Sequence, residues 1–285
     1  GGSLDEAVEI GGFFNGEGPV VQIKPGKGAP YSMSHNKPAL YHGPLIVMID
    51  RQSASASEIL AGAIKDFKRG FVIGDSHTFG KGTVQSLIDL PPKLGAIKVT
   101  ISKFYRPLGA STQLKGVDSD IVLPSLTDQM EIGEKFYETA VEWDTVKPAK
   151  VTNFKMIQPY QESLYKNHQA RMKNSNLFVD INKAIDAFEK AKEDRIKISI
   201  KEEDPSKEEK KSDSKKEEEK PSNEEKKKTD ELKKEEEITL DPALEEGLLI
   251  MGDYVNLIRQ KDLVTWSVKK PDIKVSKKLT KIKQT

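Results

Sequence analysis

Two short segments of the chain carry residue types that could perform nucleophilic chemistry. Residues 53–58 read Ser-Ala-Ser-Ala-Ser-Glu, and residues 79–85 read Phe-Gly-Lys-Gly-Thr-Val-Gln. A serine of the first segment could attack a carbonyl carbon, Lys81 could take its proton, and Gln85 could orient the lysine amine. Such a set would suffice for a serine hydrolase that uses no histidine.

The serine segment lies at a predicted junction between a strand and a helix. The apolar run of residues 44–50 is suited to a buried strand, and residues 54–67 have apolar side chains at helical spacing. Peptide amides at the start of a helix lack partners within it, and they favour the negative charge of a tetrahedral acyl intermediate. A plain structural explanation stays open, because serine is also a preferred N-cap residue.

The lysine segment has the composition that a neutral lysine would need. A lysine acts as a general base only when it is uncharged, and burial favours the uncharged form. Phe79 and Val84 offer apolar surroundings for Lys81, while Gly80 and Gly82 allow a sharp turn or a close approach of the backbone. The alternative is a solvated lysine in a glycine turn.

Histidine offers a competing base. His77 is the histidine nearest to Lys81 in sequence, although its loop, residues 74–78, reads equally well as a polar turn. No group of His, Asp and Glu has the spacing of metal ligands, so we expect no metal site.

The bulk composition excludes several classes of protein. The 285 residues have a net charge of only +1, which gives no reason to expect nucleic acid as a partner. The chain has no cysteine, so disulfides are excluded, and no apolar stretch approaches the roughly 20 residues of a membrane span. It begins at Gly1 and Gly2 without a methionine, and we expect it to be a fragment.

The first 125 residues are predicted to form an α/β domain, a sheet with helical cover. Helical spacing begins at Leu4 and is expected to end at Gly11 and Gly12, and a second helix is expected over residues 54–67. The expected strands are residues 19–24, 44–50, 71–74, 83–90 and 96–105.

The remainder of the chain is predicted to be mainly helical. Residues 126–200 contain two long amphipathic stretches, at 161–172 and 177–196. Of the 37 residues from 201 to 237, 28 are Lys, Asp or Glu, so we expect a disordered, charged low-complexity linker. Residues 238–285 are expected to form a helix that completes this domain, followed by a basic tail. The apolar face of that helix is predicted to comprise Leu244, Leu248, Met251, Tyr254 and Val255.

The chemical segments resemble the C-terminal processing peptidases, and most closely their bacterial tail-specific branch. Residues 53–59 and 78–85 carry the resemblance most specifically. Residues 1–8 are similar to the end of the glycine-rich oxyanion segment of that family, and residues 103–121 to the end of its protease core. The helical remainder resembles the C-terminal domain of the tail-specific branch. The resemblance implies a spiral-type α/β serine protease core, of which residues 1–125 are the C-terminal part, and it implies that the PDZ-like module lies outside this chain.

The resemblance also implies roles for single residues. Ser55 matches the nucleophile, Lys81 the general base and Gln85 the residue that orients the base. Glu58 and Asp66 match supporting positions.

The oxyanion hole is implied in the same way. It would consist of the amide of Ala56 and one amide from Gly1 or Gly2.

The function implied is that of a serine endopeptidase with a Ser-Lys dyad, which processes or degrades proteins from near their C-termini. Its substrates would be unfolded or C-terminally exposed proteins, with a possible adaptor protein, no cofactor, and a periplasmic or otherwise exported location. One alternative is a non-catalytic scaffold or adaptor fragment that binds protein partners. An acyl-CoA enzyme on a related α/β spiral is the other, although the sequence shows no signal for an adenine-nucleotide pocket.

Overall fold

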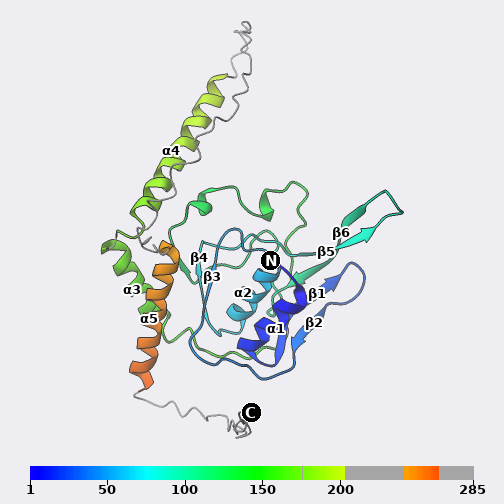
Figure 1. The fold of residues 1–285 in the computed structure, drawn as a ribbon, viewed down its shortest axis with the longest axis horizontal. Helices are drawn as coiled ribbons and strands as arrows, with labels where there is room; N and C mark the ends of the chain where they lie inside the picture. The colour runs from blue at the N-terminus through cyan, green and yellow to red at the C-terminus, as the bar shows by residue number, and fades with distance from the viewer. Residues whose placement is uncertain (175, 203–240, 263–285) are drawn as a thin grey trace, which may run out of the picture.

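The computed structural model describes residues 1–174, 176–202 and 241–262. Most of the expected charged linker and the whole of the basic tail lie outside the described residues. In Figure 1, the sheets and the two N-terminal helices occupy the middle, and the C-terminal helices stand on one side of them. The predicted α/β core followed by a mainly helical C-terminal part is confirmed for the part of the chain that the structure describes.

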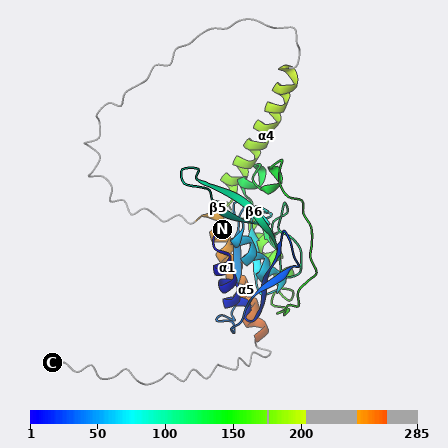
Figure 2. The same cartoon turned by 90° about the vertical axis from the view of Figure 1, so that its right-hand side faces the viewer.

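Two separate sheets form the core. One is antiparallel, in the order β2-β1-β6-β5, with β1 at Gly18–Pro25, β2 at Tyr31–His35, β5 at Thr83–Asp89 and β6 at Ala96–Tyr105. The other is parallel, in the order β3-β4-β7, with β3 at Ile46–Ile49, β4 at Phe71–Gly74 and β7 at Ile121–Val122. The hairpin of β5 and β6 projects from the body (Figures 1 and 2).

Two helices pack against the sheets. Helix α1, Leu4–Asn15, packs beside α2, Ala56–Asp66, and α2 also contacts β1 and β4. The apolar spacing that predicts α2 is confirmed by burial, because Ile59, Ala63 and Ile64 are all in the core. This packing fixes the N-terminus of α2, and with it the serine segment.

Helix α1 does not end at Gly11 and Gly12, as the sequence predicted, but continues through them to Asn15. Both glycines allow close packing. A Cβ atom on Gly11 would lie 2.8 Å from Val20, and one on Gly12 would lie 1.9 Å from the ring of His35. The tertiary fold therefore uses these glycines as contact points, and this use outweighs their low helix propensity.

Gly12→Ala is expected to lower the free energy of unfolding by about 2–3 kcal/mol, because the buried His35 ring would have to move. Gly252 is the matched control, since it also lies inside a helix but a Cβ there would meet nothing within 4 Å. Gly252→Ala should raise stability by up to about 1 kcal/mol. Urea unfolding measures both variants, and equal effects would contradict the packing explanation.

Three helices and two 3-10 turns follow the core. They are η1 at Leu126–Gln129, η2 at Glu134–Phe136, α3 at Gln161–Asn174, α4 at Val179–Glu202 and α5 at Pro242–Asp262. Helix α3 packs against α5, and α4 packs against η1. Figure 1 shows α4 extending beyond the rest of the molecule. None of the helices in the described ranges is long and apolar enough to cross a membrane.

The predicted apolar face of α5 is partly wrong. Tyr254 is buried as expected, but Leu244 and Leu248 are exposed. The buried face instead includes Glu246, which accepts hydrogen bonds from Arg171 at 2.8–3.1 Å. A pattern of apolar residues could not reveal that this face contains a buried carboxylate paired with the partly buried Arg171.

The strands β2 and β7 are also absent from the sequence prediction. The sequence of β2, Tyr-Ser-Met-Ser-His, lacks β-branched residues, and β7 is only two residues long. Both are therefore determined by their partners in the sheets.

Candidate active site

Ser55 occupies a strained turn between β3 and α2. Its backbone has φ 62° and ψ −115°, a conformation that costs a residue other than glycine about 1–3 kcal/mol. Strain of this kind at a strand-to-helix turn exposes the hydroxyl of known serine nucleophiles. The residue after Ser55, Ala56, is the first residue of α2.

Hydrogen bonding distinguishes Ser55 from its two neighbouring serines. The hydroxyl of Ser53 donates to a carboxylate oxygen of Asp50 at 2.8 Å, and that of Ser57 donates to the carbonyl of Ala54 at 2.8 Å. Among the residues that the structure describes, the hydroxyl of Ser55 donates to no acceptor; its oxygen faces the amide of Glu58 in a capping box, and Ser55 lines a cavity. Ser55 is therefore the serine of the three whose hydroxyl donates no hydrogen bond within the described residues.

Amide groups surround Ser55. The amide of Ala56 has no acceptor within α2, because it belongs to the first turn. Gly1 lies directly against the serine, since a Cβ on Gly1 would come within 2.7 Å of the Ala54 carbonyl and 3.4 Å of the Ser55 Cβ. Gly2 lines the same cavity as Ser55. Both predicted glycines thus lie close to the serine.

The carboxylate of Glu58 connects the serine turn to the lysine segment. It is fully buried and accepts four hydrogen bonds from donors in, or directly before, these two segments. The donors are the amide of Ser55 at 2.7 Å, the hydroxyl of Thr78 at 2.6 Å, and the amides of Gly80 and Lys81 at 2.7 and 2.9 Å. One side chain of α2 therefore fixes the backbones of both predicted catalytic residues.

Burial raises the pKa of Glu58 to about 7, while its hydrogen bonds from Thr78, Ser55, Gly80 and Lys81 lower it. All four partners are donors, so they match the ionised carboxylate and leave no acceptor for a proton. Burial has a larger effect on the pKa than the hydrogen bonds, so the net shift is upward.

The backbone of the lysine loop, residues 79–82, is held firmly. Gly80 has φ 92°, and a Cβ on Gly82 would lie 2.7 Å from the amide nitrogen of Gln113. The amide of Gly82 donates to the side chain of Gln113 at 2.7 Å, and the hydroxyl of Thr112 donates to the carbonyl of Lys81 at 3.0 Å. A freely solvated glycine turn would not have these contacts.

One cavity of about 340 Å³ brings the predicted residues together. Its lining includes Gly2, Ser55, Ala56, Lys81 and Gln85. Ser55 and Lys81 are partly buried, whereas Gln85 is exposed. Within the described parts of the chain, no hydrogen bond joins Ser55 to Lys81 or Lys81 to Gln85.

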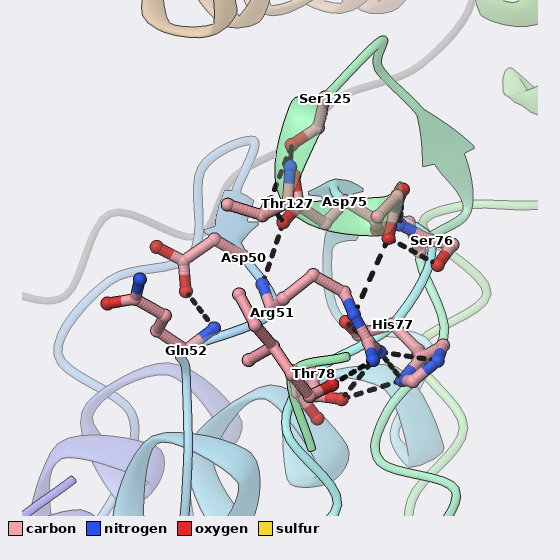
Figure 3. Close-up of polar contacts among 12 residues, drawn as sticks. Asp50, Arg51, Gln52, Asp75, Ser76, His77, Thr78, Ser125 and Thr127 are labelled. Atoms are coloured by element: carbon pink, nitrogen blue, oxygen red, sulfur yellow. Dashed lines mark hydrogen bonds and ion pairs between the residues drawn. The ribbon is translucent and has the colours of Figure 1, made fainter. Parts of the chain in front are cut away.

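His77, the competing base, is engaged elsewhere. Figure 3 shows the side chain of Arg51 reaching toward His77 and Thr78, and the guanidinium contacts the His77 ring. Burial, together with the charge of Arg51, lowers the pKa of His77. His77 does not line the cavity that contains Ser55, so its position favours a structural role.

Sequence reasoning did not identify Arg51, which is 2% exposed and organises the loop before Lys81. Its amide donates to Asp75 at 2.8 Å, and its side chain lies 3.7 Å from Asp128 and contacts the carbonyl of Ile132. The signal available was weak, because Asp128 lies far from Arg51 in sequence and no local pattern links them. Thr78 lies within the motif of residues 78–85, but no local pattern predicts its hydrogen bond to Glu58.

Asp66, the other predicted supporting residue, lies at the opposite end of α2. Its carboxylate accepts a hydrogen bond from the amide of Leu108 at 2.9 Å and pairs with Arg106. These contacts attach α2 to the segment that follows β6.

Comparison with known proteins identifies two families along the chain. Residues 1–123 match peptidase family S41, and residues 127–256 match the C-terminal domain of tail specific protease.

Individual relatives agree with these matches. The tail-specific protease of Haemophilus influenzae is 41% identical over 196 residues, which are 65% of this chain and 28% of that protein. Carboxyl-terminal-processing peptidase 2, chloroplastic, of Arabidopsis thaliana is 37% identical over 126 residues, which are 44% of this chain and 24% of that protein. This chain thus spans about a quarter of the length of these curated relatives.

Among solved structures, a photosystem II D1 C-terminal processing protease is 35% identical with a TM-score of 0.40, and the match covers 43% of this chain and 32% of that one. The resemblance seen in the sequence to the C-terminal processing peptidases and their tail-specific branch is confirmed by the two family matches, which together span residues 1–123 and 127–256, and by the Haemophilus influenzae relative.

Proposed function

We propose that this chain contains the catalytic dyad of a serine endopeptidase, with Ser55 as nucleophile and Lys81 as general base. The observation that carries the proposal is the joint attachment of both residues to Glu58, beside a cavity that both of them line. The strained backbone of Ser55 adds to it, because strain at this kind of turn is typical of a serine nucleophile.

In the proposed reaction, neutral Lys81 takes the proton of the Ser55 hydroxyl as the serine oxygen attacks the peptide carbonyl. The negative charge that develops on the carbonyl oxygen is stabilised by the amide of Ala56 and an amide of Gly1 or Gly2. Lys81 then passes its proton to the leaving amine, and the acyl-enzyme forms. Lys81 then takes a proton from water, the resulting hydroxide attacks the ester carbonyl, and Lys81 returns the proton to the Ser55 oxygen as the C–O bond breaks and the peptide acid leaves.

The missing hydrogen bond between Ser55 and Lys81 is compatible with this mechanism. Catalytic hydrogen bonds are often long in the absence of substrate and tighten only in the complex. In the proposal, a bound peptide excludes water from the cavity and brings the two side chains together, and Gln85 then orients the Lys81 amine.

We infer the biological setting from the relatives. The substrates are unfolded proteins or proteins with exposed C-termini, which the full-length protease cuts near that end, with an adaptor protein as a possible further partner. An exported, periplasmic location is proposed on the same basis. The proposal concerns the full-length protein, since this chain spans 28% of the length of the Haemophilus influenzae relative.

The second candidate is a scaffold or adaptor in which Ser55 and Lys81 have no catalytic role. A fluorophosphonate probe, which reacts only with activated serines, separates the two candidates. We expect mass spectrometry of the labelled full-length protein to find the probe on Ser55 and not on Ser53 or Ser57, whose hydroxyls already donate hydrogen bonds.

The variants Ser53→Ala and Ser57→Ala are the matched controls, and both should be labelled as well as wild type. A full-length protein that takes up no probe, or that takes it up equally on all three serines, would favour the scaffold.

A further inference from the structure

A second cavity, of about 530 Å³, adjoins the candidate active site. It shares Lys81, Thr83, Gln85 and Lys98 with the first cavity. Several of its other lining residues come from one segment, residues 133–146, which we call the strap. The strap residues in the lining are Glu134, Tyr137, Thr139, Ala140 and Val141.

The strap is attached to the lysine loop at its first end. The amide of Glu134 donates to the carbonyl of Phe79 at 3.0 Å, and the Glu134 carboxylate accepts a hydrogen bond from Gln113 at 3.3 Å. Gly133 has φ 141°, and a Cβ there would lie 2.9 Å from the same Phe79 carbonyl. The backbone of the strap therefore packs directly against the lysine loop, with no room for a side chain at Gly133.

The other end is attached to the segment after β6. The indole of Trp143 donates to the carbonyl of Ser111 at 2.9 Å, and the Lys115 ammonium lies 3.5 Å from the centre of the Trp143 ring. Asp144 accepts a hydrogen bond from Lys103 of β6 at 2.5 Å. Two fixed ends hold the residues between them in place.

Between these attachments, Tyr137, Ala140 and Val141 present apolar surface, while Glu138 and Thr139 are polar. Tyr137 is 59% exposed and Val141 39% exposed, and the ring of Tyr137 lies 6.4 Å from that of Phe79. Phe79 and Ala140 line the cavity with them. When an apolar group of a ligand covers exposed apolar side chains beside a cavity, water is released from both surfaces and the free energy of the complex is lowered.

We propose that Tyr137, Ala140 and Val141 of the strap, with Phe79, form the subsite for an apolar side chain of the substrate residue that flanks the scissile bond. This inference rests on the proposed function, because the occupant is a peptide whose carbonyl lies at Ser55. Consecutive residues of an extended peptide are about 3.3 Å apart, so a neighbouring side chain falls within reach of a cavity that shares Lys81. The strap lies within residues 127–256, so the C-terminal domain family contributes directly to substrate selection.

The test measures kcat/KM of the full-length protein for peptides that carry Ala, Val, Leu, Phe or Asp at each position flanking the cleaved bond. We expect wild type to prefer an apolar residue over Asp at one of the two positions. Val141→Trp fills the cavity and should reduce the ratio of kcat/KM for Phe against Ala by about 10-fold or more, while Tyr137→Ala opens it and should change that ratio in the other direction.

Glu138→Ala is the control, because Glu138 is an exposed strap residue outside the cavity lining and should leave the ratio unchanged. A ratio is independent of the fraction of folded enzyme, so a poorly folded variant still gives a valid result. Unchanged preference in both Val141→Trp and Tyr137→Ala would overturn the subsite. If wild type cleaves no peptide faster than Ser55→Ala does, the proposed function itself has failed.

Discussion

Ser55→Ala is expected to lower kcat/KM of the full-length protein for an unfolded protein substrate by at least about a thousandfold, because no other hydroxyl at the turn is free to attack. Lys81→Ala should cost a similar factor, since the serine then lacks a base. The two losses should not add in the double variant, because residues that act as one unit are strongly non-additive. Hydrolysis of casein, followed over time, measures all three.

Lys81→Arg separates base catalysis from simple electrostatics. Arginine carries a positive charge and cannot become neutral near pH 7, so it cannot act as the base, and this variant should be as inactive as Lys81→Ala. Ser53→Ala and Ser57→Ala serve as matched controls and should retain activity within a few-fold of wild type. Substantial proteolysis in Ser55→Ala, or in either Lys81 variant, would exclude the dyad.

Local patterns in the sequence were sufficient for the elements whose apolar spacing extends over several turns. Helix α2 is the example, because its apolar residues recur at helical spacing and are buried as that spacing requires. Helix α1 shows the limit, since the packing of Gly11 on Val20 and of Gly12 on His35 decides that the helix continues. Contacts of this kind join segments that are distant in sequence, so no local pattern can predict them.

The candidate site shows the same division. Ser55, Lys81 and Gln85 stand in two short motifs, so their types and spacing could be read directly from the sequence. Arg51 and the strap could not, because each acts through contacts with residues far along the chain. Glu58 lay inside a motif, yet only the structure shows that it accepts hydrogen bonds from both predicted catalytic segments.

Glu58 gives the second large expected effect, which is a dependence of stability on pH. Its pKa is about 7 in the folded chain against an ordinary value of 4.5, because burial disfavours the charge. The folded state therefore holds this proton in a range where the unfolded chain has released it. The contribution of Glu58 to stability is fully present below about pH 4.5 and is lost as the pH rises through about 7, a change of up to about 3 kcal/mol.

Glu58→Gln removes the titration and places an amide donor opposite four donors, which leaves buried N–H groups without acceptors at a cost of about 1–3 kcal/mol each. We expect the variant to be less stable than wild type at every pH, and the difference to be larger at pH 5 than at pH 8. Proteolysis by the full-length variant should fall at least about tenfold, because the serine turn and the lysine loop lose their common anchor. Urea unfolding at the two pH values measures the first effect, with the exposed Glu138→Gln as control. A stability difference that is the same at pH 5 and pH 8 would mean that the four hydrogen bonds outweigh burial and keep Glu58 ionised throughout.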